Sequence, residues 1–481
     1  MEPGLREVAF RIVARLQKAG HEAYWVGGCV RDMLLGKEPQ DYDVATSARP
    51  EEVERLFPRT VAVGKSFGVV RVIEGRWTIE VATFRAEAGY ADGRHPSEVR
   101  FADARADAWR RDFTINGLFY DPIRGELHDW VGGRADLEGR LIRTIGPPEQ
   151  RFAEDHLRML RAVRFAAQLD FAIEERTLAA IRQHARLLER ISAERVRDEL
   201  LKLFAPAHAA RGLRLLRESG LLEVVLPEVA AFETCEQSPD YHPEGTVYEH
   251  VLRMLEQMPP DADRLLPWAV LLHDVGKPVT ASREAETGRI RFFDHEKVGE
   301  EMTRRILERL RFPRKDIETL AFVVRHHMQF KDVPQMRKST LRRMLLRPTF
   351  PLELELHRLD CLGSHGRLEI YDLLVKERAA LESRPELVPP LLTGRDLLAL
   401  GMRPGPAMGR LLAEVREKQL AEELTTREQA LAWVQNRLAS AATESGPATA
   451  GTLAAPNASA AVTTPGPGKT PAGGSKGAAD P

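Results

Sequence analysis

The sequence predicts an α+β protein, in which a small mixed sheet with flanking helices precedes a long all-α region. Two observations support this prediction. Short apolar segments bounded by Gly and Asp crowd residues 1–150, which is typical of strands. From residue 151 to the mid-430s, apolar residues recur instead at the spacing of one helical face.

The first 150 residues supply the predicted sheet. Apolar residues at helical spacing over 5–16 predict a first helix, which Gly20 ends. Strands are predicted at 23–27, 41–45, 60–64, 68–73 and 77–84. A short helix is expected between the first two of them, and the Glu74–Gly75 step supplies the turn between the last two.

Prolines and glycines interrupt the helical region and place seams near residues 150, 225 and 385. The predicted segments are a head at 1–150, a neck at 151–225, a body at 226–385, a C-terminal helical segment at 386–438 and a tail at 439–481. The tail consists mainly of Ala, Thr, Pro, Gly and Ser. Such a composition cannot bury enough surface to offset the entropy of ordering, so we expect the tail to be disordered.

Composition excludes several classes of protein. The 481 residues include 43% hydrophobic ones, but no apolar run reaches the roughly 18 residues that span a bilayer. The N-terminus has no basic segment followed by an apolar one, so we expect no signal peptide and no membrane association. Cys29, Cys235 and Cys361 lie far apart, which suits a reducing, cytoplasmic location.

The formal net charge of −1 does not indicate a nucleic-acid-binding protein. The segment 304–347, however, contains 13 Lys and Arg against 4 Asp and Glu. Such a basic face is able to follow a phosphate backbone. The alternative is an ordinary solvated helix surface.

Two aspartates form the first candidate site. Asp41 and Asp43 alternate with Tyr42 and Val44, so on a strand both carboxylates face one side. Paired carboxylates attract a hard cation such as Mg²⁺, which completes its shell with substrate phosphates. Glu80, on the strand at 77–84, could bring a third carboxylate to the same place. Three carboxylates and two metal ions suit an in-line attack on phosphorus.

A double glycine lies upstream of these aspartates. Gly27 and Gly28 precede a helix, where backbone amides hold phosphate groups, and Arg31 adds positive charge. Either feature alone is common, since a strand end often bears two aspartates and a double glycine is often only a turn. The ordered set of GGCVRD, DYDVAT and IEVATFR favours a nucleotide site.

The segment 151–165 is predicted to be one helix, with Asp155 and Arg158 adjacent on a face, Arg161 beside them and Arg164 further around. An aspartate accepts from an amino group and an arginine donates to a ring nitrogen. That pattern matches cytosine and adenine and leaves polar groups unpaired against uracil and guanine. The alternative is an ordinary intrahelical ion pair.

The segment 107–121 lies between these two groups. Arg111, Asp112 and Asn116 are polar residues among apolar ones, and the last two are four apart, hence on one helical face. Two interpretations of these residues are open: they recognise sugar hydroxyls, or they cap a helix.

Taken in order, these segments resemble the class II tRNA nucleotidyltransferases, which include CCA-adding enzymes and bacterial poly(A) polymerases. The segments GGCVRD with DYD, RRDFTINGL, GGRADLEGRLIRTI, EDHLRMLR and ISAERVRDEL are similar to that family's motifs A to E. The resemblance implies a polymerase-beta-like head with a five-stranded sheet, followed by helical neck, body and tail. Gly117 departs from the family's usual alanine, and we expect little effect.

The resemblance also implies roles by position. Asp41, Asp43 and, less directly, Glu80 would be catalytic, the first two binding Mg²⁺. The nucleotide would be bound by Gly27, Gly28, Arg31, Asp32, Arg111, Asp112, Asn116, Asp155, Arg158, Arg161 and Arg164. The C-terminal helices would hold the tRNA.

A second cluster follows in the body. His250, His273, Asp274, His295, His327 and Asp360 are residues whose nitrogens and carboxylates suit a divalent transition metal. This set resembles the HD phosphohydrolases. In that family the first metal would be held by His250, His273, Asp274 and Asp360. His295 and His327, or His326 in its place, would support a second. The metal would be Ni, Mn, Co or Fe. The alternative is a degenerate HD fold kept as an RNA-binding scaffold.

The resulting prediction is template-independent addition of CCA to tRNA from CTP and ATP, with a phosphomonoesterase or 2′,3′-cyclic phosphodiesterase activity in the HD segment. We expect no obligate protein partner. Three alternatives remain: a poly(A) polymerase or an enzyme that adds only CC or only A, a metal-dependent phosphohydrolase with a vestigial head, and a non-catalytic RNA-binding protein.

Overall fold

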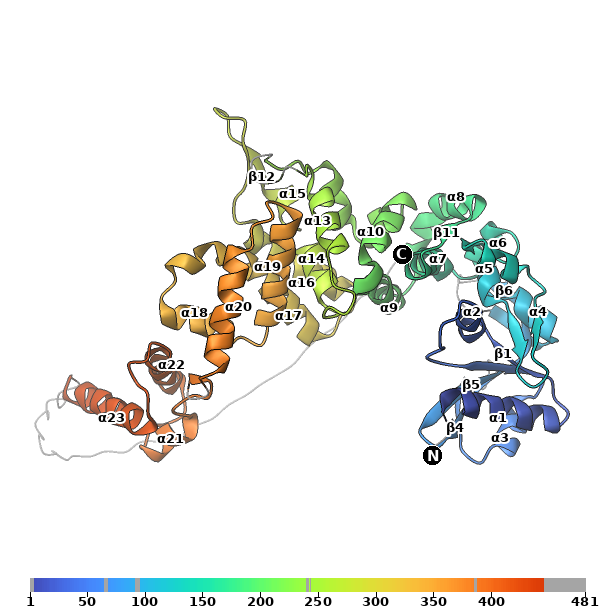
Figure 1. Cartoon of the computed structure of the whole chain (residues 1–481), viewed down its shortest axis with the longest axis horizontal. Coiled ribbons are helices and arrows are strands. Elements are labelled where there is room, and N and C mark those ends of the chain that lie inside the picture. Colours follow the sequence, from blue (N-terminus) through green and yellow to red (C-terminus); the bar gives the residue numbers. More distant parts are fainter. Residues whose placement is uncertain are drawn as a thin grey trace, which may run out of the picture. The chain divides into compact units, whose positions relative to one another are not determined.

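The computed structural model describes residues 4–64, 68–90, 96–238, 242, 244–384 and 387–444. The chain divides into two compact units, residues 1–389 and 390–481. The first unit contains the sheet and most of the helices (Figure 1). Among the described residues, no helix is both long enough and apolar enough to cross a membrane.

The head is built on one mixed sheet, which confirms the predicted fold class. Its strands are β1 (Ala23–Val26), β2 (Asp43–Thr46), β3 (Thr60–Gly64), β4 (Val69–Glu74), β5 (Trp77–Thr83), β8 (Phe119–Asp121) and β9 (Glu126–His128). Their order is β3-β4-β5-β2-β1-β8-β9. Strands β2 and β5 are parallel, and the other neighbours are antiparallel.

The sheet has seven strands rather than the five expected. The two additional strands, β8 and β9, have three residues each and are too short to show the alternation that identifies a strand. A separate hairpin, β6 (Arg85–Tyr90) with β7 (Pro96–Phe101), was also not predicted.

Helices cover the sheet and continue the chain. In the head they are α1 (Leu5–Lys18), α2 (Gly28–Leu34), α3 (Pro50–Leu56), α4 (Ala104–Trp109) and α5 (Gly133–Glu138). Helix α1 buries Val8, Ile12 and Leu16, as its spacing predicts. This apolar stripe belongs to a core of buried residues that continues from the head into the helices as far as Leu359.

The helices from 148 to 230 are α6 (Pro148–Glu154), α7 (Leu157–Leu169), α8 (Glu175–His184), α9 (Ala193–Leu203), α10 (Ala209–Glu218), α11 (Leu222–Val225) and α12 (Pro227–Ala230). The single helix predicted over 151–165 was wrong, because the chain breaks at Asp155. That residue has extended φ/ψ of −144° and 106° and caps α6. Its carboxylate accepts a bond from the Leu157 amide, which favours ending one helix and starting another there.

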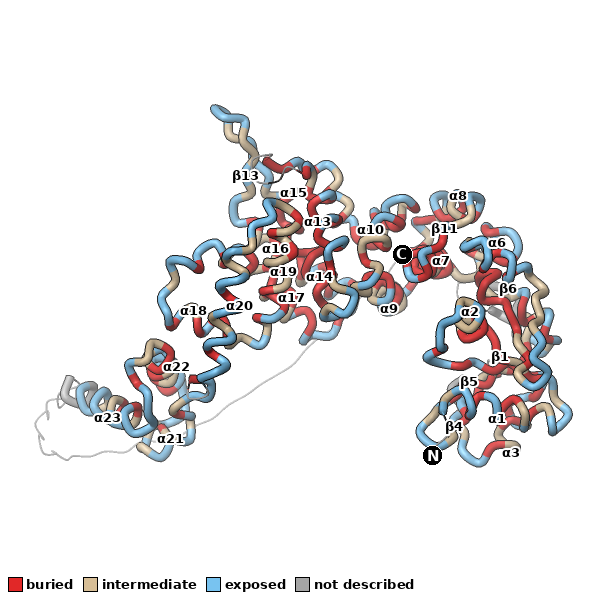
Figure 2. The backbone as a smooth tube through the Cα atoms, in the orientation of Figure 1, coloured by how far each residue is buried: buried red, intermediate tan, exposed pale blue. Residues whose placement is uncertain are grey.

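The helices from 247 to 382 are α13 (Val247–Glu256), α14 (Leu266–Leu272), α15 (Lys277–Thr280), α16 (His295–Arg309), α17 (Arg314–His326), α18 (Lys338–Leu345), α19 (Phe350–Gly363) and α20 (Glu369–Glu382). Every residue of α14 is buried, and Figure 2 shows buried backbone gathered around this helix. Two small sheets interrupt the helical region: β10 (Leu141–Ile142) with β11 (Ala172–Ile173), and β12 (Ala281–Arg283) with β13 (Ile290–Phe292).

The second unit contains α21 (Gly394–Ala399), α22 (Pro406–Leu420) and α23 (Arg427–Glu444). They enclose a separate core around Leu397, Val415 and Val434. Helix α23 continues past the predicted boundary at 438, since Ala has the highest helix propensity and recurs at 439, 441 and 442. The rest of the predicted tail, 445–481, lies outside the described residues.

Candidate active site

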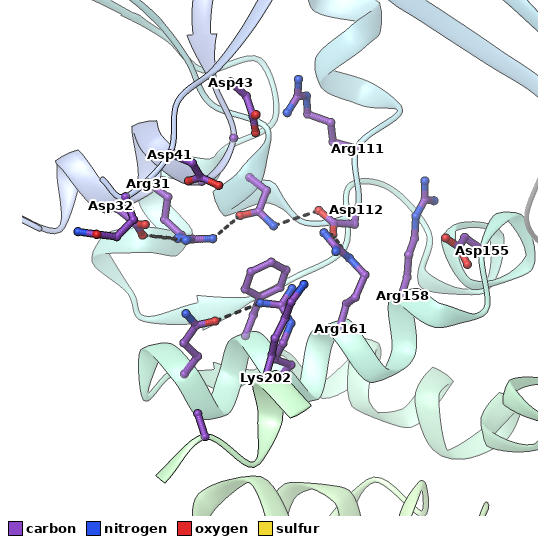
Figure 3. Close-up of a pocket in the computed structure, with 18 of the residues that line it drawn as sticks. Arg31, Asp32, Asp41, Asp43, Arg111, Asp112, Asp155, Arg158, Arg161 and Lys202 are labelled. Carbon is purple, nitrogen blue, oxygen red and sulfur yellow. Dashed lines mark hydrogen bonds and ion pairs between the residues drawn. The ribbon is translucent and has the colours of Figure 1, made fainter. Parts of the chain in front are cut away.

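One cavity of about 800 Å³ is lined from the head and from the helices that follow it (Figure 3). Of the sequence-predicted nucleotide and catalytic residues, thirteen line it and Glu80 does not. Those thirteen are Gly27, Gly28, Arg31, Asp32, Asp41, Asp43, Arg111, Asp112, Asn116, Asp155, Arg158, Arg161 and Arg164. The structure therefore brings the two predicted groups into one pocket.

The carboxylate pair lies at the start of β2. Asp43 is the first residue of that strand and Asp41 precedes it, while Tyr42 and Val44 point into the core. Asp43 is exposed to the cavity, but the surrounding protein desolvates its carboxyl, and this desolvation, followed by the neighbouring Asp41 charge, raises the pKa of Asp43 to about 6. Two oxygen donors that repel each other are the donor set a hard divalent cation relieves, so the residues present fit Mg²⁺.

Glu80 occupies the position beside Asp43 in the parallel pairing of β2 with β5. Its carboxylate accepts two hydrogen bonds from Arg71, at 2.8 and 3.0 Å. Glu80 is thus adjacent to the pair in the sheet but held by an arginine, and its catalytic role stays a prediction.

The turn before α2 requires glycine. Gly27 has φ +73°, and a Cβ added there would lie 3.1 Å from Nη1 of Arg111. Arg111 is held in turn by an ion pair of 3.1 Å with Asp107. A side chain at position 27 would therefore displace the arginine that lies towards Asp43 in the pocket.

Four polar side chains form a chain of bonds along the cavity wall. Nη1 of Arg31 donates to Asn116 at 2.9 Å, and the Asn116 amide donates to Asp112 at 3.1 Å. Arg161 then donates two bonds to Asp112, at 2.7 and 2.9 Å. Burial opposes ionisation of Asp112, but the Arg161 charge prevails and lowers its pKa to about 2.

The predicted proximity of Asp112 and Asn116 is therefore confirmed, although the segment is not a helix. Residues Thr114–Asn116 form a single 3-10 turn. A further observation corrects the expectation for Gly117. A Cβ there would lie 2.7 Å from Val131 and 3.0 Å from Ile145, so alanine does not fit without a shift of both neighbours.

The two candidate base-reading residues are held separately. Oδ2 of Asp155 accepts from Arg195 on α9 at 2.7 Å. Arg158 forms an ion pair with Glu154 and donates to the backbone carbonyls of Arg110 and Arg151, both at 3.1 Å. Both side chains are thus fixed by neighbours while each lines the cavity.

Sequence reasoning missed part of this wall. The cavity is also lined by Gln40, Arg110, Phe165, Gln168, Lys202, Ala205 and His208. Behind it, buried Glu199 forms ion pairs with Arg164 at 2.5 Å, Arg161 at 3.7 Å and Lys202 at 3.8 Å. A glutamate on the apolar side of α9 was the available signal, since a buried carboxylate needs cationic partners.

The second predicted cluster also comes together. The ligand atoms of His250, His273 and Asp274 lie within 4.8 Å of one another, as do those of Asp274, His295 and His327. Nε2 of His250 lies 3.1 Å from Asp360, and Nε2 of His295 lies 3.2 Å from that of His327. Asp274 is common to both groups.

Each histidine of this cluster is oriented through its other ring nitrogen. Nδ1 of His273, His295 and His327 is bonded to a backbone carbonyl at 2.7–2.9 Å, and Nδ1 of His250 to Glu244 at 2.8 Å. Metal-binding histidines are typically oriented in this way. The donor set of nitrogens and carboxylates thus fits a divalent transition metal.

Two details support this arrangement. His326 bonds to the Phe322 carbonyl and belongs to neither group, so His327 is the residue that joins the cluster. A Cβ on Gly276 would lie 2.2 Å from the carbonyl oxygen of His295. The glycine after the His-Asp pair therefore lets this turn approach the start of α16.

Part of the basic segment 304–347 is paired within the protein. Arg304, Arg309, Arg325 and Arg347 form ion pairs with Glu318, Glu228, Glu296 and Glu353 at 2.8–3.3 Å. These pairs favour the alternative of a solvated helix surface for that part of the segment.

Comparisons with known proteins agree with the architecture. Residues 23–143 match the family described as poly A polymerase head domain, and 170–233 match the probable RNA- and SrmB-binding site of polymerase A. Residues 242–359 match the HD domain. The fold and the site thus define a nucleotidyltransferase with an HD segment.

Individual relatives narrow the family. The A-adding tRNA nucleotidyltransferase of Deinococcus radiodurans is 36% identical over 85% of this chain and 94% of its own. The CCA-adding enzyme of Latilactobacillus sakei is 34% identical over 88% and 96%. The solved CCA-adding enzyme of Bacillus stearothermophilus in complex with CTP is 29% identical, covers 92% of this chain and 100% of its own, and superimposes with a TM-score of 0.67. The chain belongs to the family of tRNA nucleotidyltransferases and poly(A) polymerases.

Proposed function

We propose that this protein adds CCA to the 3′ end of tRNA, using CTP and ATP. One observation supports this proposal: a single cavity is lined both by the Asp41–Asp43 pair and by Asp155 with Arg158. The first pair suits phosphoryl transfer, and the second pair suits an amino group beside a ring nitrogen. On the Watson–Crick edge, cytosine and adenine present that pattern, and uracil and guanine do not.

The RNA 3′-hydroxyl attacks the α-phosphorus of the bound nucleotide, a new P–O bond forms, and the bond to pyrophosphate breaks. Asp41 and Asp43 would hold Mg²⁺, which would supply charge stabilisation to the phosphates. The Gly28 amide and Arg31 bind the triphosphate, while the Gly27 amide is bonded to the Leu118 carbonyl at 3.3 Å. Residues 386–438 hold the tRNA away from its 3′ end.

The Asp112–Arg161 pair orients the sugar side of the nucleotide. The charge of Arg161 keeps Asp112 ionised. The carboxylate accepts bonds from the Phe113 amide, Asn116 and Arg161, and so holds Asn116 and Arg161 in place for the ribose. The network to Asn116 and Arg31 then links sugar recognition to the triphosphate.

Nucleotide incorporation tests this proposal. The purified protein is incubated with Mg²⁺ and a tRNA that ends before CCA, with each labelled nucleotide alone and in pairs, and with an unrelated RNA as control. Two C followed by one A, on tRNA alone, is the expected result. Long A tails on any RNA would make the protein a poly(A) polymerase. Addition of A only to tRNA ending in CC would make it an A-adding enzyme.

A second function is favoured by the histidine–aspartate cluster. We propose that it hydrolyses phosphate monoesters or 2′,3′-cyclic phosphates. A divalent transition metal held by His250, His273, Asp274 and Asp360 would activate water and polarise the phosphate, with His295 and His327 beside it. Glu244 holds the His250 ring, and Lys277 lies 2.7 Å from Asp274.

Two matched substitutions separate the two activities. Asp43→Ala should abolish nucleotide addition and leave phosphate release unchanged, and Asp274→Ala should do the reverse. A protein that adds no nucleotide but releases phosphate, and stops doing so with Asp274→Ala, would be a phosphohydrolase with a vestigial head. Cys29, Cys235 and Cys361 are buried free thiols, which is consistent with a cytoplasmic location of the protein.

A further inference from the structure

A cavity of about 600 Å³ opens over the histidine–aspartate cluster. This volume lies within the range of roughly 300–1,000 Å³ typical of ligand pockets. One wall comes from the β12–β13 hairpin and the turn after it, which contribute Arg291, Phe292 and Phe293. Figure 1 shows this hairpin projecting from the surrounding helices. Water and a phosphate group alone would not require an apolar wall of this kind.

Phe293 is an exposed aromatic residue in that wall. The residue is 66% exposed, although it lines the cavity. Water contact with an aromatic ring is unfavourable, at roughly 25 cal/mol per Å² of apolar surface. A ligand that covers the ring would remove this cost.

The position of Phe293 is fixed relative to the cluster. The carbonyl of the preceding Phe292 is bonded to Nδ1 of His295 at 2.9 Å. The following Asp294 adopts a left-handed conformation with φ +55° and is the residue immediately before α16. The ring therefore lies two residues from a candidate metal-binding histidine, on a backbone tied to that same histidine.

Cationic groups accompany the aromatic ring. Arg291 lies 5.8 Å from the centre of the Phe293 ring and is oriented by an ion pair of 3.0 Å with Glu284. Lys331 lines the same cavity and is exposed, as is Met328 beside the cluster. Aromatic faces with nearby cations are what binds a base attached to a sugar phosphate.

We propose that Phe293 is a specificity-determining residue, on which the base of a nucleoside phosphate stacks while its phosphate reaches the histidine–aspartate cluster. The ligand class is a nucleoside 2′- or 3′-phosphate, free or at an RNA 3′ end. An aliphatic phosphate ester offers the same phosphate without the base. The inference rests on the proposed hydrolytic function for its reaction, but the binding step is measurable without turnover.

Calorimetric titration tests the binding step. Adenosine 2′-monophosphate and ribose 5-phosphate are titrated into the full chain, into Phe293→Ala and into Val279→Ala. Val279 is 65% exposed and does not line the cavity, so its variant is a matched control. Any binding of these ligands to the cavity of the head is the same in all three proteins, so it does not contribute to differences in their measured affinity.

Phe293→Ala should weaken adenosine 2′-monophosphate binding about tenfold, as expected for loss of one base–aromatic stack. Ribose 5-phosphate binding should change less than twofold, and Val279→Ala should match the parent protein. Equal weakening of both ligands, or no weakening of either, would overturn the proposal.

Phosphate release distinguishes this inference from the hydrolytic function. With the metal added, the parent protein should prefer the nucleotide over glycerol 2-phosphate, and Phe293→Ala should lose that preference through KM. If no protein releases phosphate but Phe293→Ala still binds adenosine 2′-monophosphate tenfold more weakly, the hydrolytic function is wrong and base stacking stands. If phosphate is released without preference in the parent protein, base stacking is wrong.

Discussion

Replacement of Arg195, which lies outside the nucleotide cavity, should weaken the discrimination between CTP and UTP. Arg195 does not line the cavity, but it donates to Oδ2 of Asp155 at 2.7 Å. The side chains are 26% and 20% exposed, so solvent screens this ion pair only in part. A hydrogen bond between charged groups contributes roughly 1.5–3 kcal/mol. Since the Leu157 amide still holds the other oxygen of Asp155, we expect the lower end for Arg195→Ala.

A loss of about 1.5 kcal/mol corresponds to a roughly tenfold decrease in discrimination. Single-turnover incorporation into tRNA is measured with CTP and with UTP, and kcat/KM is compared for the parent protein, Arg195→Ala and the surface control Arg182→Ala. The CTP-to-UTP ratio should fall about tenfold in Arg195→Ala alone, with melting temperatures monitored in parallel. An unchanged ratio, or equal loss of activity with both nucleotides, would refute the positioning of Asp155 by Arg195.

Three further predictions concern stability. Glu199→Gln should destabilise the protein by about 3–5 kcal/mol in urea unfolding, because it leaves the buried Arg164 charge uncompensated; a loss under 1 kcal/mol would contradict this. Gly117→Ala should cost about 1–3 kcal/mol, since its Cβ would lie 2.7 Å from Val131, and wild-type stability would show that the site relaxes freely. The lowered pKa of Asp112, from 3.8 to about 2, contributes about 2 kcal/mol above pH 5 that is lost as pH falls towards 2. The difference in unfolding free energy between the parent protein and Asp112→Asn should therefore narrow from pH 5 to pH 3, and a constant difference would exclude the linkage.

The sequence predicted the elements whose residues alternate or repeat strongly. The buried stripe of α1 and the exposed pair Asp41 and Asp43 beside buried Tyr42 follow from periodicity alone, because one face of each element is in the core. Periodicity over 151–165, by contrast, concealed the break at Asp155. The break depends on a side chain bonding to a backbone amide and to Arg195, forty residues away in sequence.

The rest of the site could not be read from spacing. Glu199 joins three cations from two helices, and Lys202 reaches the cavity because α9 packs against α7. His208 reaches it from the short 3-10 turn after α9, which also packs against α7. The histidine–aspartate cluster was predictable in membership, since each residue type binds metal. The rings of His273 and His327 are oriented by the carbonyls of Val270 and Val324, which any residue could supply. The His250 ring is oriented by the Glu244 side chain, six residues away in sequence.

The break at Asp155 bears on how this family diversifies. The residue lies between α6 and α7, in extended backbone, so its replacement leaves the backbone bonds within each helix in place and removes only its side-chain bonds to the Leu157 amide and to Arg195. Under the proposed role of Asp155, a change of nucleotide preference at this junction would therefore remove the side-chain bonds at the helix break and leave the apolar core packing in place. Relatives of similar length include an A-adding and a CCA-adding enzyme. After a gene duplication, substitutions around such a junction would let the two copies add different nucleotides to tRNA, while both proteins continue to fold.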